Sequence, residues 1–120
     1  MTIRECYEQM GADYEDVKRR LASDERIEKF FLMFTRDPSY NELVSAMEAG
    51  DAATAFRMAH TLKGVAGNLS LTELGHASSE LCESMRAGSI PPEAAELYAR
   101  VKECYERAMA AAEALKQGRQ

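Results

Sequence analysis

Apolar residues recur every three or four positions through most of the chain, which is the spacing of one face of an α-helix. The two longest stripes lie in the second half, at Leu74, Ala77, Ser78, Leu81 and Met85, and at Ala94, Leu97, Val101, Cys104, Ala108, Ala111 and Leu115. No stretch reads as a β-strand. The pattern therefore predicts an all-α fold, arranged as an antiparallel up-down four-helix bundle with a short N-terminal helical lid.

Capping residues mark two short helices at the N-terminus. Thr2 and Glu5 have the spacing of a capping box, and Gly11 can end the helix that they begin. Asp13 can cap a second short helix. We expect these helices to form the lid, residues 1–22, across one end of a bundle that spans residues 24–117.

The next apolar stripe runs through Pro38. Proline in a helix interior costs about 3 kcal/mol and normally kinks or ends the helix. The stripe keeps its phase across the proline, which favours one bent helix over residues 24–49. The alternative is two shorter helices joined at Asp37 and Pro38.

Further start and stop residues define the rest of the bundle. Asp51 can begin a helix that runs to about residue 69, and Thr72 can begin one that ends near Gly88. The short connection between them predicts an antiparallel hairpin. A final long helix follows Pro91 and leaves a frayed tail at residues 116–120.

The composition fits one domain over residues 1–120, since the chain has 120 residues, of which 46% are hydrophobic. No segment approaches the roughly 20 apolar residues of a membrane span, and the first residues lack the layout of a secretory signal. We therefore expect a cytoplasmic monomer with no membrane partner. Three widely spaced cysteines support neither a disulfide framework nor a metal knuckle, so we expect free thiols at Cys6, Cys82 and Cys104.

Charge is distributed unevenly in this acidic chain. The net charge of −5 argues against a general nucleic-acid partner. The 21 residues between Asp51 and Glu73 contain no acid, where the average of 20 in 120 would place three or four. Arg57 and Lys63 are the only formal charges in that window. One surface is thus free of negative charge, which suits a site that carries an anion.

A histidine lies at the centre of this acid-free window. At roughly 100° per residue, His60, Lys63, Gly64 and Gly67 fall on one helix face, opposite the apolar residues. Glycine within a helix costs about 1 kcal/mol relative to alanine, so two glycines beside a histidine indicate space cleared for a large partner. Phe56, about 40° from His60 on the same wheel, is either the centre of a docking patch or packed against a neighbouring helix.

These residue types suit a covalent anion site. An imidazole at neutral pH usually has one ring nitrogen free to act as a nucleophile. Lys63 is placed one turn from His60, where its ammonium can neutralise an anion bonded to that nitrogen. His76 falls opposite its own apolar stripe and is expected to be solvated. A metal site built from the two histidines would lack an i, i+4 ligand pair, and we expect none.

The run from Ala59 to Leu71, AHTLKGVAGNLSL, resembles the signature of histidine-containing phosphotransfer (HPt) domains. The resemblance implies a four-helix bundle that exchanges a phosphoryl group with aspartates of response-regulator receiver domains, fed by a hybrid histidine kinase. It implies that His60 is phosphorylated, that Lys63 stabilises the phosphate and that Gly64 leaves room for it. No cofactor is implied on this chain, because the Mg²⁺ is expected on the receiver. The protein is then a carrier and not an enzyme in its own right.

Two positions depart from the family pattern. Ser70 stands where members commonly have a glycine, and Cys82 stands where many have a glutamine that hydrogen-bonds the histidine ring. A thiol is a poor substitute for that amide. Arg86, one turn beyond Cys82, either adds positive charge to the His60 face or is a solvated surface residue. The expected binding surface comprises Phe56, Arg57, Gly67 and Arg86.

Three other functions compete with a phosphorelay intermediate. A pseudo-HPt adaptor would dock receivers without carrying phosphate, and His60 with Lys63 argues against it. The phosphoacceptor module of a chemotaxis-type kinase would be joined to an ATP-binding domain, and none lies within these 120 residues. A helical enzyme using His60 as acid or base would need a paired carboxylate, which the acid-free window does not supply.

Overall fold

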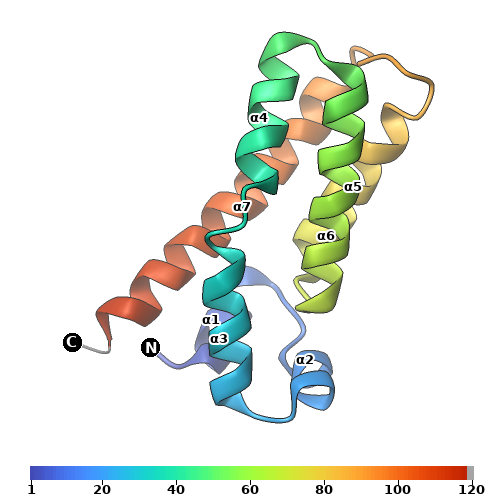
Figure 1. The fold of residues 1–120 in the computed structure, drawn as a ribbon. Helices are drawn as coiled ribbons and strands as arrows, with labels where there is room; N and C mark the ends of the chain where they lie inside the picture. The colour runs from blue at the N-terminus through green and yellow to red at the C-terminus, as the bar shows by residue number, and fades with distance from the viewer. Residues whose placement is uncertain (119–120) are drawn as a thin grey trace.

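The computed structural model describes residues 1–118, and helices account for most of them (Figure 1). In chain order the helices are α1 (Ile3–Met10), α2 (Tyr14–Leu21), α3 (Asp24–Phe34), α4 (Ser39–Ala49), α5 (Ala52–Asn68), α6 (Thr72–Ser84) and α7 (Ala94–Gln117). No strand occurs among the described residues. The predicted all-α fold is confirmed.

The helices pack largely in chain order. α4 lies against α5, α5 against α6 and α6 against α7, while α1 packs on the C-terminal part of α7 and on α3. Figure 1 shows α7 running along the length of the molecule, with α4, α5 and α6 over its first half and α1, α2 and α3 gathered near its other end. Where α1 meets α7, the Cys6 thiol donates to the carbonyl oxygen of Ala111 at 3.4 Å.

The predicted caps at the N-terminus are present. Thr2 and Glu5 form a reciprocal capping box, and Gly11 ends α1 in the left-handed conformation at φ 64°. The side chain of Asp13 accepts a hydrogen bond from the backbone N–H of Asp16 at the start of α2. Each cap satisfies backbone N–H groups that the first helical turn leaves without a partner, so these local boundaries follow from the sequence.

The predicted single bent helix over residues 24–49 is wrong, because α3 ends at Phe34 and α4 begins at Ser39. Pro38 has no N–H to continue the ladder. The chain instead turns through Thr35, whose hydroxyl donates to the carbonyl oxygen of Leu32 at 2.6 Å. The carboxylate of Asp37 accepts from the N–H of Ser39 at 2.8 Å and so starts α4. The structure therefore has the alternative arrangement, two shorter helices joined at Asp37 and Pro38.

The apolar stripes form the core as predicted. The five stripe positions of α6 are all buried, and five of the seven on α7 are buried while Leu97 and Cys104 are half-buried. Aromatic rings fill the region where α1, α3 and α7 meet, with Tyr7, Phe31, Phe34 and Tyr105 in edge or stacked contact. The expected fraying from residue 116 is wrong for Lys116 and Gln117, which belong to α7, and Arg119 and Gln120 lie outside the described residues.

Candidate functional site

The helix α5 presents His60 to solvent. Asp51 caps its start by accepting from the N–H of Thr54 at 3.1 Å. Ala59, Leu62 and Ala66 are buried against the core, at 0%, 1% and 0% exposure. The opposite face is open, and it carries the predicted site residues His60, Lys63, Gly64 and Gly67, all of which are exposed. The helical phase inferred from the sequence is therefore confirmed.

The two glycines on this face do not serve internal packing. A Cβ built at Gly64 or Gly67 meets nothing within 4 Å. Alanine would fit at both positions without displacing a neighbour, and it would favour the helix by about 1 kcal/mol. The fold alone therefore gives no reason for glycine here, and the open surface beside His60 is available to a second molecule.

Positive charge flanks His60 on both sides of the helix. Arg57 and Lys63 are exposed, and at roughly 100° per residue they lie to either side of His60. Lys63 also lines a shallow groove between α5 and α6, together with Gly67 and His76. His76 is exposed, as predicted, and no group of three or more His, Cys, Asp or Glu among the described residues is arranged to hold a metal ion.

Phe56 and Arg86 meet one turn before His60. Phe56 is half-buried, and the guanidinium carbon of Arg86 lies 5.3 Å from the centroid of its ring. Phe56 therefore packs against α6 and also forms part of the surface next to His60. Arg86 reaches this surface, but it makes two hydrogen bonds to Glu83, of 2.6 Å and 2.9 Å. The positive charge of Arg86 is thus paired.

Cys82 contacts α5 at its backbone. Its thiol is 2% exposed and donates a weak hydrogen bond of 3.7 Å to the carbonyl oxygen of Phe56. Burial raises the pKa of this thiol above its usual value. Cys82 therefore packs at the contact between α6 and the turn of α5 before His60.

Two acidic residues near the site were missed by the sequence reasoning. Residues 52–72 contain no acidic residue, but α6 packs on α5 and brings Glu83 close to Lys63 and His60. The i, i+3 spacing of Glu83 and Arg86 is the signal that could have revealed the pair. Asp16 approaches the end of α5 from α2, where its Oδ2 accepts a hydrogen bond from the hydroxyl of Ser70 at 2.6 Å.

The N-terminal helices hold the end of α5. Arg20 of α2 donates to the carbonyl oxygen of Gly67 at 2.9 Å, and Tyr7 of α1 donates to that of Leu69 at 2.7 Å. Ser70 has φ 56°, the left-handed region that glycine occupies most easily. The turn thus has a conformation that glycine adopts most easily, and Asp16 accepts a hydrogen bond from the serine that occupies it.

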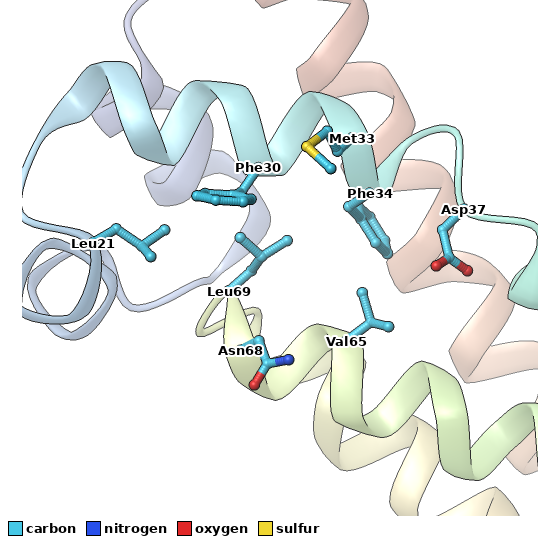
Figure 2. A pocket seen from close by; sticks show the side chains of 8 residues that line it. All are labelled: Leu21, Phe30, Met33, Phe34, Asp37, Val65, Asn68 and Leu69. Carbon is cyan, nitrogen blue, oxygen red and sulfur yellow. The ribbon is translucent and has the colours of Figure 1, made fainter.

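An apolar groove of about 370 Å³ opens beside this end of α5. Figure 2 shows Phe30 and Met33 of α3 facing Val65 of α5 and Leu69, the residue after α5, across it, with Leu21 at one side. Met33 is 51% exposed, whereas Phe31 and Phe34 are buried. Of the three phenylalanines of α3, Phe30 is the ring left partly outside the core.

The helical fold thus places an outward histidine, a lysine one turn on and two glycines together on one exposed helix face. The Hpt domain model matches residues 37–114, and the chain belongs to the Hpt domain family. Hpt domains are phosphotransfer carriers of two-component signalling that interact with receiver domains and histidine kinases. No curated protein and no solved structure matched the chain. Among the described residues, no helix has the length and apolar character needed to cross a bilayer.

Proposed function

We propose that this protein is a phosphorelay intermediate, which accepts a phosphoryl group on His60 from a receiver aspartate and passes it to another receiver aspartate. The observation that carries the proposal is the open α5 face of an Hpt domain, where His60 is exposed with Lys63 and Gly64 beside it. The partners are receiver domains and a hybrid histidine kinase, and the setting is the cytoplasm.

The transfer is a displacement at phosphorus. The lone pair of the unprotonated ring nitrogen of His60 forms the N–P bond, while the P–O bond to the receiver aspartate breaks and its carboxylate leaves with the electron pair. The second ring nitrogen keeps its hydrogen. The reverse steps deliver the group to the next aspartate. We expect Mg²⁺ on the receiver and no cofactor on this chain.

Lys63 and Gly64 have separate roles in this proposal. Lys63 neutralises part of the phosphoryl charge from one turn away, in a region of α5 that has no carboxylate of its own. Gly64 leaves space for the phosphoryl group and for the receiver that delivers it, because nothing occupies the position of its missing side chain.

The docking surface extends from the His60 face in both directions along α5. Phe56, Arg57 and Arg86 form its part before His60, and Gly67 continues the exposed face toward the end of α5, where Asn68 and Leu69 border the apolar groove. The apolar residues Phe30 and Met33 line that groove and suit the centre of a protein interface, with the arginines and Lys63 as its polar rim.

The whole chain acts as one monomeric unit in this proposal. Residues 24–117, which hold α3 to α7, provide the antiparallel four-helix bundle, and α1 and α2 are the lid over one end. The contacts of Arg20 with Gly67 and of Asp16 with Ser70 support this role of α2, since they connect it to the end of the helix that carries His60.

The proposal is tested by incubating the protein with a phosphorylated receiver domain and Mg²⁺. Acid-labile, base-stable label should appear on the wild type and on His76→Gln, and it should be absent from His60→Gln. Stoichiometric label on His60→Gln would refute the assignment. Lys63→Ala should slow the transfer while the urea midpoint of unfolding is unchanged, and Lys102→Ala on α7 provides the matched control.

One observation favours a second function. Cys82 replaces the glutamine common in the family, and its thiol is bonded to the backbone of α5. A phosphate-independent adaptor needs no side chain to orient the His60 ring. Such an adaptor would bind the receiver in the same experiment and take no label from it.

A further inference from the structure

Glu83 holds Arg86 beside the proposed phosphoryl site. The carboxylate accepts hydrogen bonds from Nε of Arg86 at 2.9 Å and from its Nη2 at 2.6 Å, so both carboxylate oxygens are engaged. Both side chains are more than half exposed, at 55% for Glu83 and 63% for Arg86. The contact is therefore a surface ion pair between residues one turn apart, of the kind that contributes little to folding stability.

The packing of α6 on α5 places this pair near His60. The thiol of Cys82, adjacent in sequence to Glu83, bonds to the carbonyl oxygen of Phe56, which lies one turn before His60. The guanidinium of Arg86 lies over the ring of Phe56. The hydrogen bonds from Arg86 hold the pKa of Glu83 below its usual value, and the charges of Lys63 and His60 lower it further.

We propose that Glu83 is a positioning residue, which holds Arg86 in the unphosphorylated protein and releases it to the phosphoryl group once His60 is phosphorylated. This inference rests on the function proposed above. Arg86 then pairs with Glu83 before phosphorylation and with the phosphoryl group after it. Glu83 opposes phosphorylation of His60, because it competes for Arg86.

The exchange follows from the charges involved. A phosphoryl group carries close to two negative charges and three acceptor oxygens, so it competes well against one carboxylate for a guanidinium. The new dianion also repels Glu83, which weakens the pair that holds Arg86. Arg86 has a long, exposed side chain and lies just beyond the end of α6, so its guanidinium is accessible to a second partner. No covalent bond changes in this step.

The experiment measures how label is distributed between the protein and one receiver domain when transfer has reached equilibrium. This ratio reports the stability of the phosphohistidine, and it is independent of how fast the proteins dock. Removing Arg86 in Arg86→Gln should lower the share on His60 about two- to five-fold, the range of an exposed ion pair. Glu83→Gln should raise it by a similar factor, because Arg86 no longer has a competing partner.

The double variant Glu83→Gln, Arg86→Gln tests whether Glu83 acts through Arg86. The proposal expects most of the gain from Glu83→Gln to be lost once Arg86 is absent, leaving only the smaller part that comes from relief of the direct repulsion between the phosphoryl group and Glu83. An equal gain in both backgrounds, or no gain in either, would overturn it. Glu80→Gln is the matched control, since Glu80 is on the same helix and pairs with Arg100 of α7 at 3.3 Å, and it should leave the ratio unchanged.

A second measurement follows Arg86 directly. In ¹⁵N NMR spectra, the Nε–H signal of Arg86 should shift when His60 is phosphorylated, and that of Arg100 should not. If the wild type takes label but the Arg86 signal does not shift, the exchange of partners is contradicted while the proposed function still stands. A wild type that takes no label on His60 would remove the proposed function, and this inference with it.

Discussion

The hydroxyl of Ser70 donates a hydrogen bond of 2.6 Å to the carboxylate of Asp16, which joins the turn after α5 to the helix α2. Arg19 and Arg20 form ion pairs with the same carboxylate, at 3.2 Å and 3.3 Å. Arg20 continues to the carbonyl oxygen of Gly67. A single network thus connects the N-terminal helices to the end of the helix that carries His60.

This network should make stability depend on acid. The hydrogen bond from Ser70 is the main cause that lowers the pKa of Asp16 from its ordinary value of 3.8, with Arg20 and Arg19 also contributing. A carboxyl group with a lowered pKa stabilises the fold above its ordinary pKa, and this contribution is lost as the pH falls through the lowered value. Asp16→Asn should therefore be less stable than the wild type at pH 7, and the difference should shrink as the pH falls below 3.8.

Urea unfolding followed by circular dichroism at pH 7, 5, 3 and 2 measures this difference. Glu15→Gln is the control, since Glu15 is the neighbouring acid on α2 and makes only a long, exposed ion pair of 3.6 Å with Arg4. An offset of Asp16→Asn from the wild type that stays constant over this pH range would contradict the prediction.

The sequence predicted the features that are local. Thr2 and Asp13 cap their helices within four residues, and the phase of α5 follows from residues within two turns of His60. Pro38 is the local feature predicted wrongly. A stripe can stay in phase across two separate helices as well as across one bent helix, so phase did not decide the question, while the missing N–H of proline did.

Features between helices could not be predicted in the same way. Asp16 meets Ser70 across 54 positions and Arg20 meets Gly67 across 47, and neither spacing has a helical signal. The acid-free window was counted along the chain, whereas electrostatics acts through space, where α6 adds Glu83. The exposure of His60, Lys63, Gly64 and Gly67 was predictable because all four lie on one helix, whereas contacts with residues of other helices were not.

Gly64→Ala should separate stability from function. The exposed position accepts a Cβ with nothing within 4 Å, so we expect α5 to gain about 1 kcal/mol in the free energy of unfolding. The new methyl group would stand beside His60, where it should slow phosphoryl transfer from a receiver. Urea unfolding and the rate of labelling measure the two effects.

Gly75→Ala is the control for that variant. Its Cβ would make an ordinary contact of 3.8 Å with Ala66, so a similar gain in stability is expected on α6, across the groove from Lys63 and Gly67. Its transfer rate should equal that of the wild type. If Gly64→Ala also transferred at the wild-type rate, Gly64 would have no part in clearing the site.

Ser78→Ala should stabilise the protein. Ser78 is fully buried at 0% exposure, and its hydroxyl has no hydrogen-bond partner among the described residues. Burying an unpaired hydroxyl costs about 1–3 kcal/mol, and alanine removes that cost with little loss of volume. Thermal and urea unfolding should both show a higher midpoint. Ser84→Ala is the contrast, because that hydroxyl donates to the carbonyl oxygen of Leu81 at 2.7 Å and its loss should bring no gain. A destabilised Ser78→Ala would show that the hydroxyl has a partner.

Met33→Glu should weaken docking of the receiver and leave the chemistry of His60 intact. Met33 is 51% exposed at the apolar groove between α3 and α5, so a carboxylate there would not disturb the core. Placing a charge at the centre of an apolar interface typically costs about 1–2 kcal/mol or more of binding free energy. Transfer from a receiver at low concentration should slow by about five- to thirty-fold on that scale.

Labelling by phosphoramidate, a small phosphoryl donor that needs no protein interface, distinguishes docking from chemistry. Met33→Glu should take label from phosphoramidate at the wild-type rate. Ala99→Glu adds the same charge to an exposed position on α7 and should match the wild type with both donors. If Met33→Glu were labelled equally slowly by both donors, the groove would act on His60 itself. If its rate of labelling by the receiver equalled that of the wild type, the groove would lie outside the docking surface.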